Sequence, residues 1–392
     1  MDRVITAHNH LAVPPSVPYP EPLRSIISRE SMERARTVMA DWPGYSATPL
    51  VRLPALAQGL GLGACYLKDE GARWDLKSFK ALGGAYAVSE ISAAARGPLT
   101  VCCATDGNHG RSVAWGARRV AARAVIYLHE RVNAYREEAI RQYGAETVRV
   151  AGTYDDSVRA AAAAAAENGW VVVSDTSYPG YDEIPRLVMQ GYTVLVDEVL
   201  AQLPPGERLT HVVLQGGVGG LAAAVTGYLW DVLGPARPEV VVVEPERAAC
   251  LLASARAGRP EVVHGSLDTL MAGLSCGEVS ALAWDILAPG ARHFIAIPDE
   301  RIRPVMRALA SGAWGEPVVS GESGAAGVAG LEAAAADPVL RDAIGLDAGS
   351  RVLAINTEGD TDPGLYRELV GRSADDVMRT HEKEHEPWKP YR

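Results

Sequence analysis

The feature that most constrains the fold is a regular alternation of short apolar runs with longer segments of helical length, from about residue 64 to residue 355. The runs are rich in Val, Ile and Leu on both faces, and the segments between them are amphipathic or rich in Ala. This pattern predicts an α/β protein whose sheets are mainly parallel and covered by helices. The nine predicted strands are residues 65–69, 99–104, 124–128, 147–151, 171–175, 211–215, 240–244, 293–297 and 351–355.

Nine strands in one chain suggest two sheets, and hence two three-layer α/β domains with a ligand-binding cleft beyond the carboxyl ends of the strands. We expect residues 46–84 and 193–372 to form a large domain and residues 85–192 a small one. Residues 1–45 are punctuated by Pro and weakly periodic, which predicts an extended arm. Residues 373–392 are charged and predict a polar tail.

The overall charge excludes several classes of partner. The chain has 38 Lys and Arg against 48 Asp and Glu, a net charge of −10, so it lacks the basic surface that nucleic acid or anionic lipid requires. The N-terminus has no apolar core typical of a signal peptide, and no apolar run reaches the length of a membrane span. Five Cys make no disulfide framework. We expect a soluble, cytoplasmic protein.

Lys80 is the first candidate for chemistry. The triplet Ser78-Phe79-Lys80 opens a predicted helix and is followed by small residues. An apolar wall and a helix N-terminus both lower the pKa of an amine, so we expect a lowered pKa for Lys80. Such an amine can form a Schiff base. The alternative is an ordinary solvated lysine on an amphipathic helix.

Two polar loops follow predicted strands. TDGNHG (105–110) either projects polar groups at a ligand or is a plain turn. INTEGDTDP (355–363) carries a Thr and acidic groups suited to binding a ring nitrogen, whereas Asp362-Pro363 is also a good helix start. The sequence leaves both alternatives open at each loop.

A glycine-rich segment, LQGGVGGLAAA (214–224), joins a predicted strand to a helix that begins near residue 221. Successive glycines let main-chain N–H groups face an anion beside the helix N-terminus, which predicts a phosphate site. Residues 217–222 also match G-x-G-x-x-A, a dinucleotide motif, with Glu244 ending the next strand. That reading would make the chain a nicotinamide-dependent oxidoreductase.

A last motif lies in the tail, where His381-Glu382-Lys383-Glu384-His385 matches the zinc-protease pattern H-E-x-x-H. Zinc proteases hold this motif on a helix inside a protected cleft with a third ligand nearby. Here it is close to the chain end, carries charges between the histidines and precedes Pro387. We therefore predict a solvated tail and no metal.

Taken in order, the first four segments resemble the fold-type-II pyridoxal-phosphate enzymes, the threonine dehydratase and tryptophan synthase β group. Within that group the chain is most similar to the diaminopropionate ammonia-lyases. The resemblance spans about residues 45–372. It rests on KDE…FKALGG (68–84), TDGNHGR (105–111), EIPRLVMQGY (183–192), TLMAGLSCGE (269–278), SGESGAAG (320–327) and NTEGDTDP (356–363).

The resemblance implies a pyridoxal 5'-phosphate cofactor, bound by the large domain, and a role for individual residues. Lys80 would be the Schiff-base lysine and the base for an L-substrate, with Phe79 beside it; Asp106 would be an acid or base on the opposite face. Asp175, at the end of strand 171–175, would face the substrate's amino group. Asn108 would bind the ring hydroxyl and Thr357 the pyridine nitrogen, while the phosphate would lie on Gly216, Gly217, Val218, Gly219 and Gly220.

The resemblance further implies a homodimer and a possible disulfide between Cys250 and Cys276. The sequence departs from the family at Thr176–Gly180, where a Trp is usual, and at Gly71–Asp75, where Ser-x-Arg-Phe-Gly is usual. Both departures were expected to lie near the substrate. They put the substrate's identity in doubt.

The implied reaction is elimination of ammonia from 2,3-diaminopropionate, which yields pyruvate and a second ammonia. Two carboxylates, Asp106 and Asp175, suit a substrate with one cation more than serine. The alternatives are an elimination from serine, threonine or hydroxyaspartate, the nicotinamide-dependent oxidoreductase, and a non-catalytic amino-acid sensor.

Overall fold

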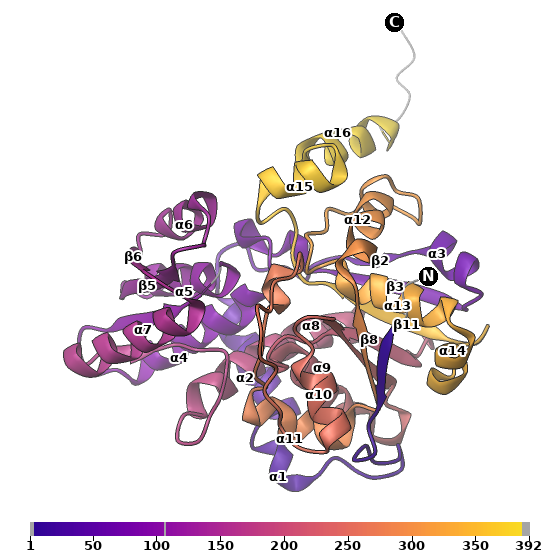
Figure 1. The fold of residues 1–392 in the computed structure, drawn as a ribbon, viewed down its shortest axis with the longest axis horizontal. Helices are drawn as coiled ribbons and strands as arrows, with labels where there is room; N and C mark the ends of the chain where they lie inside the picture. Colours follow the sequence, from indigo (N-terminus) through magenta and orange to yellow (C-terminus); the bar gives the residue numbers. More distant parts are fainter. Residues whose placement is uncertain (1–3, 106, 386–392) are drawn as a thin grey trace, which may run out of the picture.

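The computed structural model describes residues 4–105 and 107–385, and its core is a seven-stranded sheet (Figure 1). The strand order is β1-β10-β9-β8-β11-β3-β2; the five inner strands are parallel, and the two edge strands are antiparallel to their neighbours. The strands are β1 (Ile5–His8), β2 (Leu50–Arg52), β3 (Ala64–Asp69), β8 (His211–Gln215), β9 (Glu239–Pro245), β10 (His293–Ile297) and β11 (Arg351–Asn356).

A second, four-stranded sheet is parallel throughout, in the order β6-β5-β4-β7. Its strands are β4 (Thr100–Ala104), β5 (Arg123–His129), β6 (Glu146–Val150) and β7 (Val171–Val172). Each of the nine predicted strands is present, so the predicted α/β class with two mainly parallel sheets is confirmed. The strand predicted at 171–175 is shorter than expected, which leaves Asp175 in the loop beyond β7.

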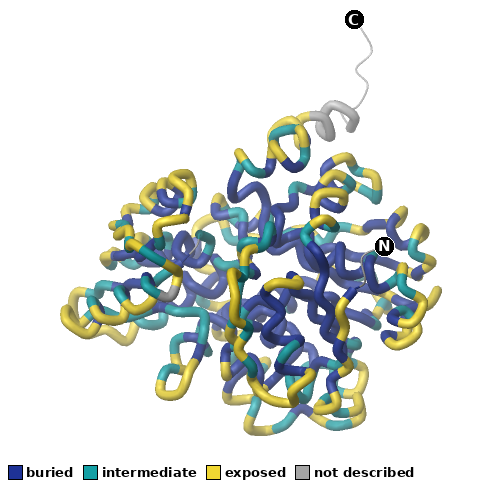
Figure 2. Tube along the Cα trace, viewed as in Figure 1, coloured by how far each residue is buried: buried dark blue, intermediate teal, exposed yellow. Residues whose placement is uncertain are grey.

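Helices cover both faces of each sheet. On the large sheet, one face packs against α2, α8, α9, α10 and α11, and the other against α3, α12, α13, α14 and α15. The hydrophobic core on the first of these two faces continues into the small sheet through α4, α5 and α6. Helix α7 covers the opposite face of the small sheet. Figure 2 shows the buried positions concentrated along these inner strands and helices.

The helix bounds are α1 (Glu21–Arg24), α2 (Arg29–Ala40), α3 (Pro54–Leu60), α4 (Tyr86–Ala94), α5 (Asn108–Arg119), α6 (Ala134–Arg141), α7 (Tyr154–Asn168), α8 (Glu183–Gln202), α9 (Gly220–Leu233), α10 (Cys250–Ala257), α11 (Ala281–Gly290), α12 (Ile302–Ala310), α13 (Ala326–Ala336), α14 (Pro338–Ile344), α15 (Pro363–Val370) and α16 (Ala374–His385). None of them, within the part of the chain that is described, is long and apolar enough to cross a membrane.

The two sheets divide the chain as the predicted domains do, since every strand of the small sheet lies within residues 85–192. The predicted boundaries themselves fall inside helices. Residue 84 lies in a π-helix, Ala81–Ala85, and residue 192 lies in α8. The exact domain limits therefore stay a prediction.

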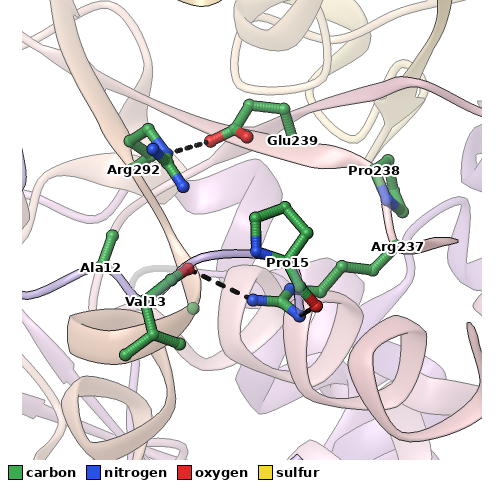
Figure 3. A pocket seen from close by; sticks show the side chains of 8 residues that line it. Ala12, Val13, Pro15, Arg237, Pro238, Glu239 and Arg292 are labelled. Atoms are coloured by element: carbon green, nitrogen blue, oxygen red, sulfur yellow. Dashed lines mark hydrogen bonds and ion pairs between the residues drawn. The ribbon is translucent and has the colours of Figure 1, made fainter. Parts of the chain in front are cut away.

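The N-terminal arm is more regular than the sequence suggested. It contains β1, α1 and α2, and α2 begins with a capping box in which Ser28 and Ser31 exchange hydrogen bonds. Arg237 stabilises the loop between β1 and α1 by donating hydrogen bonds to main-chain carbonyls of residues 13–17, as Figure 3 shows for Val13 and Pro15. The hollow beside it has a volume of about 10 Å³, at most room for one water molecule. It is therefore not a ligand site.

Two short strands, β1 and β2, were not predicted from the sequence pattern, for a physical reason. Strand β1 is exposed at three of its four residues, and β2 is only three residues long, so neither forms an apolar run. The tail also differs from expectation, because residues 374–385 form α16. Its Ala374 and Val377 are buried.

Candidate functional site

Lys80 lies where the large sheet, α5 and the π-helix meet. Ser78 forms a β-bridge with Glu358, and the N–H of Phe79 donates to the carbonyl of Thr357 at 3.1 Å. Ser112 of α5 donates to the carbonyl of Lys80 at 2.6 Å. The π-helix that follows Lys80 is a rare geometry that recurs at functional sites. The molecule has two lobes, one built on each sheet. Both hold the main chain around Lys80, through Thr357 after β11 of the large sheet and Ser112 of α5 beside the small sheet.

Small residues after Lys80 allow this close packing. A Cβ at Gly83 would lie 2.4 Å from the ring of Tyr192, and one at Gly84 would lie 2.3 Å from Oγ of Ser112. The small residues after Lys80 are therefore required sterically, because α5 and α8 pack directly against this segment.

The ammonium of Lys80 forms an ion pair with the carboxylate of Asp175. The lysine side chain is only 20% exposed, and its Nζ lies 5.3 Å from the centre of the Phe79 ring and 6.0 Å from that of Tyr192. Lys80 is therefore not a solvated surface lysine.

The expected direction of the Lys80 pKa was wrong. Burial lowers this pKa, as the sequence suggested, but the charge of Asp175 and its hydrogen bond outweigh burial, so the pKa of Lys80 is raised. For Asp175, burial alone would raise the pKa, yet the charge of Lys80 and its hydrogen bond lower it well below its usual range. In the structure as it stands, the pair is charged.

A short loop after β7 places Asp175. The hydroxyl of Tyr181 donates to the carbonyl of Val172 at 2.8 Å and accepts from the N–H of Ser174 at 3.0 Å. His109 anchors the same loop through Nε2, which lies 2.7 Å from the carbonyl of Val173. Asp175 thus faces the amino group of Lys80, and its role towards the substrate's amino group stays a prediction.

Asn108, the first residue of α5, contacts the segment after β11. Its Nδ2 donates to Glu358, which also accepts from the N–H of Ser323 at 3.0 Å. Thr357 is buried beside these groups. Asp362 caps α15 by accepting from Leu365 at 3.1 Å, so the predicted helix start is confirmed. Asp106 lies outside the described residues.

The glycine segment forms a tight turn between β8 and α9. Gly217 and Gly219 have φ of +65° and +96°, which other residues rarely adopt. A Cβ at Gly220, where α9 begins, would lie 3.8 Å from the carbonyl oxygen of Asp175 and 3.9 Å from Tyr192. The first N–H groups of a helix have no intrahelical acceptors, so this turn is a main-chain cradle suited to a phosphate and borders the Lys80 pair.

The dinucleotide interpretation fails at Glu244. This side chain is fully buried and accepts hydrogen bonds from the N–H groups of Leu251 at 2.9 Å and Leu252 at 2.7 Å. Its carboxylate caps α10 and does not face a ribose.

The sequence did not identify Tyr192, His109 or the pair of Arg136 and Glu322 as site residues. Arg136 donates to Glu322 at 3.1 Å, across the two lobes. Burial and the nearby charge of Glu358 raise the pKa of Glu322 to about 8, although Arg136 opposes this. Tyr192, His109 and Glu322 lie in segments that carry the family resemblance, whereas Arg136 does not, and no residue spacing indicates an interaction between positions 186 residues apart.

A cleft of about 470 Å³ opens between the lobes beside Arg136. Lys80 is not among its lining residues. They are His129, Arg131, Val132, Asn133, Arg136, Asp268, Thr269, Ala272, Ser275, Asp362, Leu365 and Glu368.

Cys250 and Cys276 both flank the glycine turn, but the implied disulfide between them is not formed. Cys250 Sγ lies 3.5 Å from the carbonyl oxygen of Gly217, and Cys276 Sγ would lie 3.8 Å from a Cβ at that glycine. No cluster of metal ligands occurs among the described residues. The side chains of His381 and His385 lie outside that description.

The segments that depart from the family pattern have structural partners. Arg73 is buried between Glu70 and Glu198, and Trp74 packs against Trp42 and Trp115. These contacts join the segment to the arm, α5 and α8. The charge of Arg73 is therefore neutralised inside the fold, and the expected closeness of this segment to the substrate stays a prediction.

Comparisons with known proteins agree with this geometry. Residues 42–358 match the family described as pyridoxal-phosphate dependent enzyme. Diaminopropionate ammonia-lyase of Escherichia coli K12 is 39% identical over 367 residues, covering 88% of this chain and 92% of that protein. The Salmonella typhimurium LT2 enzyme of the same name is 40% identical over 364 residues, covering 85% and 90%.

Solved structures are similar as well. The E. coli diaminopropionate ammonia-lyase in complex with an aminoacrylate-PLP azomethine reaction intermediate superposes with a TM-score of 0.86 and 37% identity, covering 94% of this chain and 97% of that one.

Proposed function

Since the chain belongs to the diaminopropionate ammonia-lyase family of pyridoxal-phosphate-dependent enzymes, we propose that it eliminates ammonia from 2,3-diaminopropionate to give pyruvate. The observation that carries this proposal is the buried pair of Lys80 and Asp175, which borders a main-chain phosphate cradle at the junction of the lobes. The reaction releases a second ammonia when the aminoacrylate product hydrolyses.

The residues around Lys80 fit the cofactor of this family. The cradle of Gly216, Gly217, Val218, Gly219 and Gly220 would hold the phosphate at the start of α9. Asn108 would bind the ring hydroxyl, Thr357 the pyridine nitrogen, and Phe79 would lie beside Lys80. When bound, pyridoxal phosphate supplies an electron sink that stabilises the charge left after removal of the α-proton.

The protein's own groups supply binding and proton transfer. Lys80 holds the cofactor and, as a neutral amine, removes the α-proton of the substrate. Asp175, which now pairs with the Lys80 ammonium, would pair with an ammonium of the substrate. Asp106 would supply the second carboxylate, so that two negative charges meet the two ammonium groups of a diamino acid. The β-ammonium group, paired with one of these carboxylates, would depart as neutral ammonia when its bond to carbon breaks.

Replacing Lys80 tests the assignment directly. Lys80→Ala should abolish the visible absorption of the purified enzyme and reduce pyruvate release from diaminopropionate by at least about 10³-fold, because both nucleophile and base are lost. Arg123→Ala is the control, since Arg123 pairs with Glu146 on the surface, away from Lys80, and this variant should retain both signals. An absorption spectrum that survives Lys80→Ala would overturn the role of Lys80.

A substrate panel tests the reaction. We expect pyruvate release from diaminopropionate to exceed release from serine, and 2-oxoacid release from threonine and hydroxyaspartate, when rates are compared as kcat/KM with both enantiomers. Faster turnover of a hydroxy amino acid would assign the enzyme to that substrate class instead.

We also infer that the enzyme is a homodimer in the cytoplasm. The family resemblance supports the dimer, and five cysteines that form no disulfide, four of them buried, suit a reducing compartment. Light scattering of the purified protein should give twice the 41.6 kDa mass of the chain. A monomeric mass would contradict the dimer.

A further inference from the structure

His109 has a buried nitrogen atom without a partner. The residue lies in the first turn of α5 and is 7% exposed. Its Nε2 is 2.7 Å from the carbonyl oxygen of Val173, whereas Nδ1 has no hydrogen-bond partner among the described residues. A buried nitrogen of this kind is costly unless it acquires a partner at some stage.

The hydrogen bond at Nε2 determines what Nδ1 is. A carbonyl oxygen only accepts, so Nε2 must carry a hydrogen, and Nδ1 of the neutral ring is then a bare acceptor. The atom that Nδ1 faces is Oδ2 of Asp175, 3.9 Å away, which is also an acceptor. Two acceptors cannot satisfy one another. A proton placed on Nδ1 would satisfy both.

The same carboxylate oxygen also pairs with Lys80. Oδ2 of Asp175 therefore lies between an ammonium and an imidazole. While Lys80 is protonated and His109 is neutral, the three groups sum to zero charge. If Lys80 lost its proton to solvent, Asp175 would remain as an uncompensated charge in a buried setting, which costs several kcal/mol.

We propose that His109 accepts the proton that Lys80 must release before it can act as a nucleophile or base. An N–H bond breaks at Nζ of Lys80, the proton passes over Oδ2 of Asp175, and an N–H bond forms at Nδ1 of His109. The Asp175 carboxylate is unchanged, and the net charge of the three groups stays at zero. This proposal rests on the proposed role of Lys80.

The distance between Nδ1 of His109 and Oδ2 of Asp175 fits the state in which Lys80 still holds its proton. The distance of 3.9 Å is about 1 Å longer than a hydrogen bond, so transfer requires Asp175 to release Lys80 and approach His109. The movement is small, because Val173, which anchors His109, and Asp175 share one loop.

The nearby charges change the pKa of His109 in the direction that favours the proposed transfer. Burial lowers the pKa of His109, Asp175 raises it, and the charge on Lys80 lowers it. Loss of the Lys80 charge therefore raises the pKa of His109. The other titratable groups that interact with Asp175 are Cys103, Tyr181 and Tyr192, and burial raises the pKa of each, so they stay neutral near pH 7.

The test measures the protonation of His109 directly. Histidine-selective isotope labelling of the full chain, with His109→Gln to assign the signal, gives its titration by NMR. We expect the midpoint to lie at least about one pH unit higher in Lys80→Met than in Lys80→Arg, which keeps the cation. Adding Asp175→Asn to Lys80→Met should cancel the increase. Equal midpoints in the Met and Arg variants would overturn the proposal.

Kinetics of His109→Gln provides a second test, because Gln keeps an N–H donor for Val173 but cannot be protonated. We expect kcat to fall by about 10²-fold with little change in KM, while the visible absorption persists. An unchanged kcat would overturn the relay. Failure of the proposed function has a different signature, namely absorption that does not depend on Lys80. If His109→Gln fails to fold, the His109 signal is assigned by correlating its ring with its backbone resonances, and the two Lys80 variants then decide.

Discussion

Two lysines twelve residues apart, Lys68 and Lys80, are each paired with a carboxylate, yet their surroundings differ. Lys68 is completely buried and has three partners: Glu198 at 2.7 Å, the carbonyl of Thr48 at 2.7 Å and Gln202 at 3.0 Å. Arg73 and Glu70 complete a group of two cations and two carboxylates. Lys80 is partly exposed, and its only ion-pair partner among the described residues is Asp175, beside the bare nitrogen of His109.

These surroundings distinguish the ion cluster around Lys68, which stabilises the fold, from the pair of Lys80 and Asp175, which can exchange a proton. Burial lowers the pKa of Lys68 despite its carboxylates, whereas Asp175 raises that of Lys80. In the Lys68 cluster every charge has several partners, so a transferred proton has no acceptor. The Lys80 pair has an acceptor within one small movement. Residue type and charge alone do not distinguish the two sites; the number of satisfied partners does.

The largest effect should come from breaking the structural cluster. Arg73→Met leaves Glu70 and Glu198 without their shared guanidinium, and we expect the free energy of unfolding to fall by about 3–5 kcal/mol in urea titrations. The matched control is Arg123→Met. Arg123 pairs with Glu146 on the surface, with both side chains about half exposed, and its loss should leave the free energy of unfolding nearly unchanged. Similar losses in the two variants would remove the distinction between buried and exposed pairs.

Exchanging the two lysines for Met compares the clusters directly. Lys68→Met leaves Oε1 of Gln202 without its donor and Glu198 without one of its two cations, so we expect a loss of about 1–3 kcal/mol in cofactor-free protein. Lys80→Met should cost less than about 1 kcal/mol, because Asp175 can then pair with protonated His109. Differential scanning calorimetry of both variants provides the measurement. A greater loss for Lys80→Met would show that the reactive pair is also a main source of stability.

The last effect is small within any one pH unit and concerns Glu322, whose buried side chain pairs with Arg136. Its pKa is about 8 in the folded protein against 4.5 ordinarily, so the folded state holds a proton that the unfolded state has released. Its contribution to stability is therefore complete below pH 4.5 and is lost as the pH rises towards 8, by up to about 1.4 kcal/mol per pH unit. Glu322→Gln should flatten this part of the stability curve. A slope equal to that of the unmodified chain would contradict the shift.

Much of the architecture follows from local pattern. The nine apolar runs predicted nine strands, since a strand buried on both faces must be apolar throughout. The glycines at 216–220 predicted a tight turn at a helix start, because only Gly tolerates the φ of Gly217 and Gly219. Strands β1 and β2 were missed because edge strands need no apolar run.

By itself, the sequence determined the α/β class, the position of Lys80 directly before a run of small residues, and the glycine cradle, because these depend on neighbours along the chain. Only the tertiary structure decided that Asp175 pairs with Lys80 and reverses its expected pKa, that Arg73 is neutralised in a buried cluster, and that His109 presents a bare nitrogen. The reason is physical. Charge and hydrogen bonding act over a few ångströms in space, and residues 80, 109 and 175 lie in three separate segments of the chain.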